Sequence, residues 1–84
     1  MSKVIETRTE TVTLGDDGIL RCKVKPTDVH TLEDAVENVR ASATLAGGVR
    51  VPALLDARAA RGITRQAREY YTGPENAKVV LGTA

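Results

Sequence analysis

The chain has 84 residues, a formal net charge of +1 and a 42% share of hydrophobic residues, with no Trp and no Phe. A chain of this length forms one small domain, residues 1–84, whose aliphatic core lies near the lower limit for independent stability. The near-zero net charge gives no support to binding of nucleic acid or of an anionic membrane surface.

The N-terminus has no secretory signal pattern, and no apolar run is long enough to span a bilayer. The single cysteine, Cys22, cannot form an intramolecular disulfide. Both features favour a protein of the reducing cytoplasm.

The first part of the chain predicts a β-hairpin. Residues 4–14 are rich in Val and Thr and form one expected strand, which stops at a Gly/Asp-rich turn over residues 15–18. Residues 19–25 form the second strand, in which alternation places Cys22 and Val24 on the buried face.

A helix is predicted after this hairpin. Thr31 is a suitable N-cap with Asp34 three residues later, and Gly47 with Gly48 ends the helix. Glu33, Glu37 and Arg40 are expected to face solvent. The residues expected to face inward are Leu32, Val36, Val39, Ala43 and Ala46.

The apolar run over residues 51–55 predicts a strand buried on both faces and parallel to the strand before the helix. A helix over residues 65–71, a short turn over 74–77 and a last strand over 78–83 follow. The order is β-β-α-β-α-β, which predicts an α/β domain with a mixed sheet and helices on one or both faces.

Four phrases of the sequence carry a family likeness: DDGILRCKVKP, TLEDAVENV, VPALLDARAARGITRQAREYY and GPENAKVV. They resemble a bacterial family of uncharacterised proteins with the fold of STAS and anti-sigma-factor-antagonist domains. The resemblance implies a functional loop and helix after a strand that ends in a residue like Asp56. The look-alike family continues beyond the last strand, so the resemblance implies either a truncated chain or an edge strand that pairs with another molecule.

The loop and helix after this strand contain the candidate site. Arg58, Arg61, Arg65 and Arg68, with the free N–H groups of the helix that starts at Thr64, could bind a phosphate or an acidic partner, or they could form an ordinary solvated helix face. Asp56 lies at the strand end, where open α/β sheets bind ligands, or it pairs with Arg58 or caps the loop. Antagonists of the STAS type carry a phosphorylatable Ser where Thr64 stands here, so Thr64 is a candidate phosphoacceptor by resemblance, and otherwise a plain N-cap.

The residues offer little for catalysis. Cys22 and His30 would need a shared cleft and a third, orienting group to act as a nucleophilic pair, and inert packing of Cys22 is the simpler interpretation. One of the two tyrosines, Tyr70 or Tyr71, is expected to be buried. No metal-ligand spacing and no phosphate-binding glycine motif is present, so we expect no metal and no cofactor.

The sequence therefore predicts a non-catalytic STAS-like module that binds a partner protein or a small ligand such as an anion. Two alternatives stay open. One is a structural unit that self-associates as a homodimer, favoured by the small core and the unpaired last strand. The other is a small enzyme, for which the chain lacks a convincing set of acid-base groups.

Overall fold

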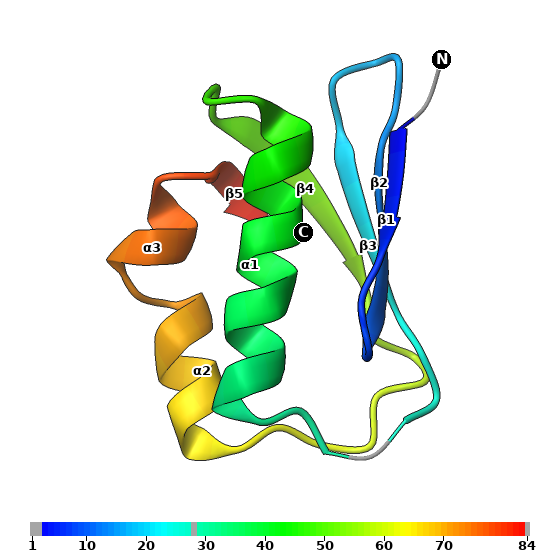
Figure 1. Ribbon diagram of the computed structural model, residues 1–84, viewed down its shortest axis with the longest axis vertical. Helices are drawn as coiled ribbons and strands as arrows, with labels where there is room; N and C mark the ends of the chain where they lie inside the picture. The colour runs from blue at the N-terminus through cyan, green and yellow to red at the C-terminus, as the bar shows by residue number, and fades with distance from the viewer. Residues whose placement is uncertain (1–2, 28, 84) are drawn as a thin grey trace.

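The computed structural model describes residues 3–27 and 29–83 of the chain. Within these residues it contains five strands and three helices, which Figure 1 labels in chain order. The elements are β1 (Lys3–Glu6), β2 (Glu10–Leu14), β3 (Leu20–Val24), α1 (Leu32–Ala46), β4 (Val51–Asp56), α2 (Arg65–Tyr71), α3 (Pro74–Ala77) and β5 (Val80–Thr83).

The strands form a single sheet in the order β1-β2-β3-β4-β5. β1, β2 and β3 pair antiparallel, whereas β4 is parallel to both β3 and β5. The prediction of a mixed sheet with a parallel crossover through the long helix is confirmed, and so is the α/β class.

The prediction of one strand over residues 4–14 is wrong, because the chain turns back between β1 and β2. The Thr7 amide donates to the carbonyl of Glu10 at 2.9 Å, and the Glu10 amide donates to the Thr7 hydroxyl at 3.0 Å. These bonds close a tight turn without glycine or proline, the residues that normally signal one. The element order is therefore β-β-β-α-β-α-α-β.

Both predicted ends of α1 are confirmed. Thr31 and Asp34 form a complete capping box at the N-terminus. At the other end Gly47 adopts a left-handed conformation with φ of 65°, and its amide donates to the carbonyl of Ala43.

The predicted inward face of α1 is correct only in part. Val39 is buried, but Leu32 and Ala43 are exposed, whereas Asn38 and Ser42 point inward. The helix is turned this way because its N-terminal half faces the polar β1–β2 turn, where Asn38 finds hydrogen-bond partners. Glu33, Glu37 and Arg40 are exposed, as predicted.

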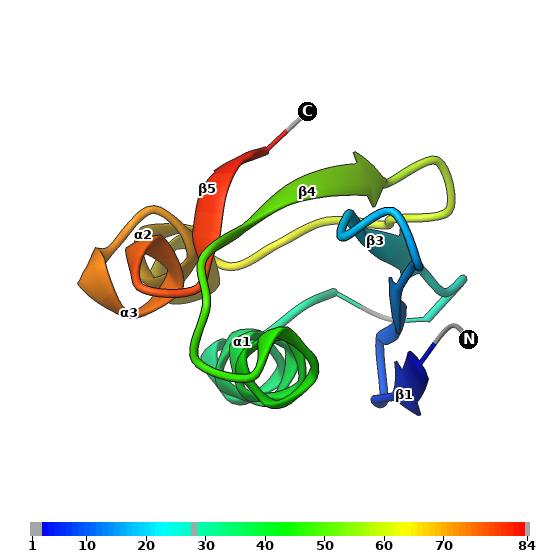
Figure 2. The same ribbon diagram turned by 90° about the horizontal axis from the view of Figure 1, so that it is seen from above.

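The prediction that β4 is buried on both faces is also wrong. Ala53 is buried, but Leu54 and Leu55 are 42% and 48% exposed. Figure 2 shows the reason for Leu54, which points away from the face of buried Ala53: α1, α2 and α3 lie on one side of the sheet, and the outward face of β4 is uncovered. The buried core is correspondingly small, with its central cluster formed by Val12, Leu20, Ala41, Leu45 and Ala53.

Candidate functional site

A cavity of about 450 Å³ lies between the sheet and the helices α1 and α2. Its inner wall is apolar, with Leu20 and Val24 from β3, Val39 from α1, and Ala53 from β4. Its rim includes residues that are exposed to solvent, so the cavity is open to small molecules. The exposed rim residues are Leu54, Leu55, Ala57, Ala60 and Thr72.

The cavity follows from the side chains that the sequence supplies. Cys22, Ser42, Ala53 and Gly62 are all small, and each lies on the cavity wall. The chain has no Phe or Trp that could reach across from the opposite wall. These small side chains therefore do not fill the space between the helices and the centre of the sheet.

Glu10 is the acidic residue in the wall of this cavity. It lies at the start of β2 opposite Val24 of β3, on the same face as buried Val12, and is only 5% exposed. No group in the described part of the chain donates a hydrogen bond to its carboxylate, and burial alone raises the pKa of Glu10 to about 7. A buried carboxyl of this kind is costly to the free protein and available to a ligand.

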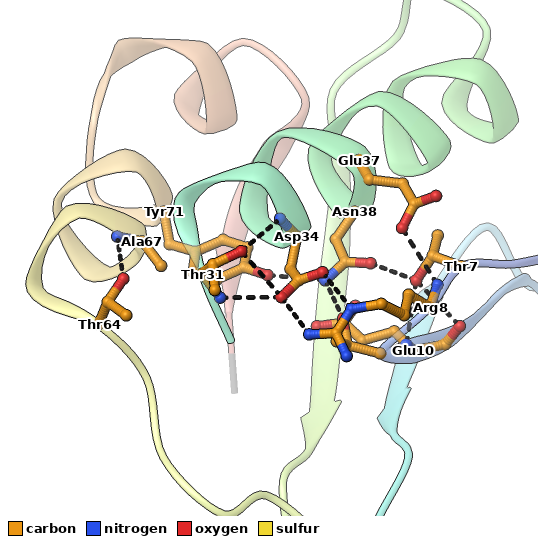
Figure 3. A network of polar contacts seen from close by, with 11 residues as sticks. Thr7, Arg8, Glu10, Thr31, Asp34, Glu37, Asn38, Thr64, Ala67 and Tyr71 are labelled. Atoms are coloured by element: carbon orange, nitrogen blue, oxygen red, sulfur yellow. Dashed lines mark hydrogen bonds and ion pairs between the residues drawn. The ribbon is translucent and has the colours of Figure 1, made fainter. Parts of the chain in front are cut away.

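The backbone beneath Glu10 is held by a network of polar contacts, drawn in Figure 3. The Thr7 hydroxyl accepts from the Glu10 amide and donates to the side-chain oxygen of Asn38. The side-chain nitrogen of Asn38 donates to the Thr9 hydroxyl at 2.9 Å and to the Tyr71 hydroxyl at 2.8 Å. Asn38 thus connects the β1–β2 turn, α1 and α2 at one point, which fixes one wall of the cavity.

A second part of the network joins the same turn to the start of α1. The Arg8 guanidinium donates to both carboxylate oxygens of Asp34, at 2.8 and 2.5 Å, and the Thr31 amide donates to Asp34 at 2.8 Å. These hydrogen bonds hold the pKa of Asp34 well below its usual range, and the hydrogen bond from Arg8 has the largest effect. Asp34 is therefore a satisfied structural carboxylate, unlike Glu10.

His30 contributes a second unpaired polar group to the cavity wall. Its backbone is fixed, because its amide donates to the carbonyl of Gly62 at 3.0 Å and its carbonyl accepts from the Thr64 amide at 2.9 Å. The residue is only 5% exposed, and its Nε2 atom is buried without a hydrogen-bond partner. Burial lowers the pKa of His30, so the neutral ring is favoured.

Cys22 and Tyr71 line the same cavity, so Cys22 and His30 do share a cleft. Burial, with a smaller contribution from the Glu10 charge, raises the pKa of the Cys22 thiol to about 12. Burial also raises the pKa of Tyr71 above its ordinary value. Both groups are therefore neutral hydrogen-bonding groups at neutral pH, and Cys22 is a thiol rather than a reactive thiolate.

The predicted arginine site lies outside the cavity wall. Arg58 pairs with Asp56 at 2.7 Å and Arg65 with Glu69 at 3.0 Å, while Arg61 and Arg68 are exposed. The Thr64 hydroxyl accepts from the Ala67 amide at 3.2 Å, which confirms Thr64 as the N-cap of α2. Its role as a phosphoacceptor and the anion site at these residues stay predictions. What the loop does contribute to the cavity is Ala57, Ala60, Gly62 and Ile63.

In the part of the chain that the structure describes, no group of three or more His, Cys, Asp or Glu side chains is placed to hold a metal ion. Among the same residues, every helix is too short or too polar to cross a membrane.

Comparison with known proteins gives a family. Residues 13–84 match the family model described as "Domain of unknown function (DUF7793)". The chain belongs to the DUF7793 family. No curated protein and no solved structure matches it. The DUF7793 match begins inside β2, so it includes Cys22, His30, Asn38 and Tyr71 of the cavity region, while Glu10 precedes it.

Sequence reasoning missed Glu10 and Asn38. For Glu10 a signal was present, because alternation counted back from Val12 and Leu14 places Glu10 on the inward face. The interpretation of residues 4–14 as one strand grouped Glu10 with the polar residues Glu6 and Arg8, so its inward position was not predicted. For Asn38 the sequence gives no comparable signal, since its partners Thr9 and Tyr71 are 29 and 33 residues away.

Proposed function

We propose that this DUF7793 domain binds a small, largely apolar molecule in the cavity between the sheet and the helices, and that it acts by binding rather than by catalysis. The observation that carries the proposal is the cavity itself, about 450 Å³ in volume, apolar in its walls and open at its rim. Ligand sites in proteins typically have volumes of roughly 300–1,000 Å³ and few polar groups.

The polar groups of the cavity support the same proposal. Glu10 and His30 both line the cavity and are 5% exposed. The Nε2 atom of His30 has no hydrogen-bond partner, and no described residue donates a hydrogen bond to the Glu10 carboxylate. Buried polar groups in proteins are normally hydrogen-bonded. Unpaired polar groups beside an open cavity therefore favour binding of a ligand that supplies the missing hydrogen bonds.

A binding role without chemistry is supported by the state of Cys22. Its thiol is held protonated by burial, and no hydrogen bond in the described residues joins it to His30. A nucleophilic cysteine needs a lowered thiol pKa and an adjacent base. The resemblance to antagonist domains, which implies action through binding, favours the same class of role.

All the residues that line the cavity described above belong to one chain. The proposal therefore needs no second copy, and the predicted homodimer and protein partner stay separate predictions. The small-ligand alternative is favoured over an anion at the arginines because Arg58 and Arg65 are already paired with carboxylates.

The test is a titration with naphthylmethanol, a neutral apolar probe, followed by backbone amide NMR shifts. We expect saturable shifts at wall residues such as Cys22, Ala53 and Gly62. Cys22→Phe places a ring in the cavity and should abolish them, whereas Thr44→Phe, an exposed change on α1 at a residue that does not line the cavity, should leave them unchanged.

If Cys22→Phe does not fold, Ala60→Phe at the rim replaces it as the blocking variant. The proposal is overturned if no wall amide shifts up to the solubility limit of the probe, or if a folded blocking variant binds the probe as the wild type does.

A further inference from the structure

We infer that the ligand carries a protonated amine on its apolar body and that the Glu10 carboxylate is the counter-ion for this amine. This inference rests on the proposed binding function and adds the chemical class of the ligand.

The charge of the cavity wall favours a cationic ligand. Glu10 is its acidic residue, and the lining residues include no Lys and no Arg. An anionic ligand would place a second negative charge beside Glu10 without a cation to offset it, which is unfavourable in a poorly solvated site. A cationic group would instead pair with the carboxylate.

The lack of hydrogen bonds to the Glu10 carboxylate favours the same class of ligand. Its backbone is anchored through Thr7, yet its carboxylate receives no hydrogen bond from the described residues. A carboxylate is an acceptor-only group, so it needs donors. An ammonium offers three N–H donors and a positive charge, which makes a charge-assisted hydrogen bond of the stronger kind.

The neighbouring groups suit an ammonium rather than a metal ion. His30 and Tyr71 line the same cavity, and the neutral imidazole and the phenol hydroxyl are both groups that can accept hydrogen bonds. A divalent cation would require several oxygen or nitrogen ligands gathered at one point, and the described residues contain no such group.

The pH dependence of binding can be assigned to specific groups. The titratable groups facing Glu10 are Cys22 of β3, His30 before α1 and Tyr71 of α2, with the Asp34–Arg8 pair beyond them on α1 and the turn. Cys22 and Tyr71 stay neutral at neutral pH, and the Asp34 carboxylate is already paired. Ionisation of Glu10 therefore dominates any change in amine affinity as the pH rises through about 7.

The experiment compares three probes that share one ring system: naphthylmethylamine, naphthylmethanol and naphthoate. Affinities are measured by amide NMR titration of wild type, Glu10→Gln and the cavity-blocked Cys22→Phe. In the wild type above neutral pH we expect the amine to bind roughly tenfold more tightly than the alcohol, and naphthoate more weakly than either. Glu10→Gln should abolish the preference for the amine and retain binding of the alcohol.

The outcomes separate the two proposals. If none of the probes binds, the proposed function fails. If the alcohol binds but the amine binds no more tightly, or if the amine preference persists in Glu10→Gln, only the amine inference is overturned. If a folded Cys22→Phe binds the probes as the wild type does, the proposed function fails. Should Glu10→Gln fail to fold, the wild type decides: amine affinity must rise with pH through about 7 relative to that of the alcohol, and a constant ratio overturns the inference.

Discussion

Two buried carboxylates, Glu10 and Asp34, show how the local supply of donors decides the state of a side chain. Both residues are 5% exposed. Asp34 receives hydrogen bonds from Arg8 and Thr31, which keep its pKa low. Glu10 receives none from the described residues, and its pKa rises to about 7. At equal solvent exposure, the carboxyl with hydrogen-bond donors is a structural anion, and the more strongly desolvated carboxyl without them has a raised pKa.

Glu10→Gln should remove a pH dependence of stability. In the unfolded chain the carboxyl loses its proton near its ordinary pKa of 4.5, but in the folded chain only near 7, so the folded state holds an extra proton between these values. Stability from this group is therefore lost as pH rises through about 7, by up to about 3 kcal/mol. Urea unfolding of both proteins at about pH 5 and about pH 8 measures this difference.

Glu33→Gln, an exposed change on α1, is the matched control and should follow the wild type. A variant Glu10→Gln whose unfolding free energy falls with pH as steeply as that of the wild type would show that Glu10 is solvated and not buried in the cavity wall.

At the scale of elements, the contact between the β1–β2 turn and α1 positions the cavity wall. Asn38 lies at its centre and binds Thr7, Thr9 and the hydroxyl of Tyr71. A polar residue on the inward face of a helix that carries three contacts of this kind specifies how the turn, α1 and α2 fit together.

Asn38→Ala should destabilise the fold by about 2–4 kcal/mol, because loss of the amide side chain leaves three buried or half-buried hydroxyl groups without this hydrogen-bond partner. Thermal or urea unfolding measures the loss. Thr44→Ala, an exposed change on the same helix, should stay within about 0.5 kcal/mol of the wild type. Equal stability of the two variants would mean that the network is not formed in solution.

The elements that sequence could predict are those whose signals are local. Thr31 and Gly47 bound α1 through hydrogen bonds to residues three or four positions away, so a short window of sequence contains the whole cause. The β1–β2 turn was missed because the Thr7 hydroxyl stabilises it by accepting a hydrogen bond from the Glu10 amide. Threonine is also common in strands, so its presence alone does not indicate a turn. The inward face of α1 was predicted only in part, because the partners of Asn38 lie in the distant β1–β2 turn and in α2.

For the whole molecule, the decisive feature is a sheet covered on one face only and a core with no large aromatic side chain in its centre. The apolar run of β4 predicted a strand covered on both faces, but in a chain this short the helices cover one face, and Leu55 lies at the rim of the cavity instead. Apolar side chains in the sequence could not distinguish a filled core from a lined cavity, because both require the same residue types. The cavity becomes visible only when the volumes of facing residues are compared in three dimensions.

The most direct test of the account is a crystal structure of the chain grown with naphthylmethylamine. The account predicts the naphthyl ring between Val39 of α1 and Ala53 of β4, with the amine nitrogen within hydrogen-bond distance of the Glu10 carboxylate. A structure in which the side chains close over the cavity, with the probe absent from it or bound only at the surface, would contradict the account.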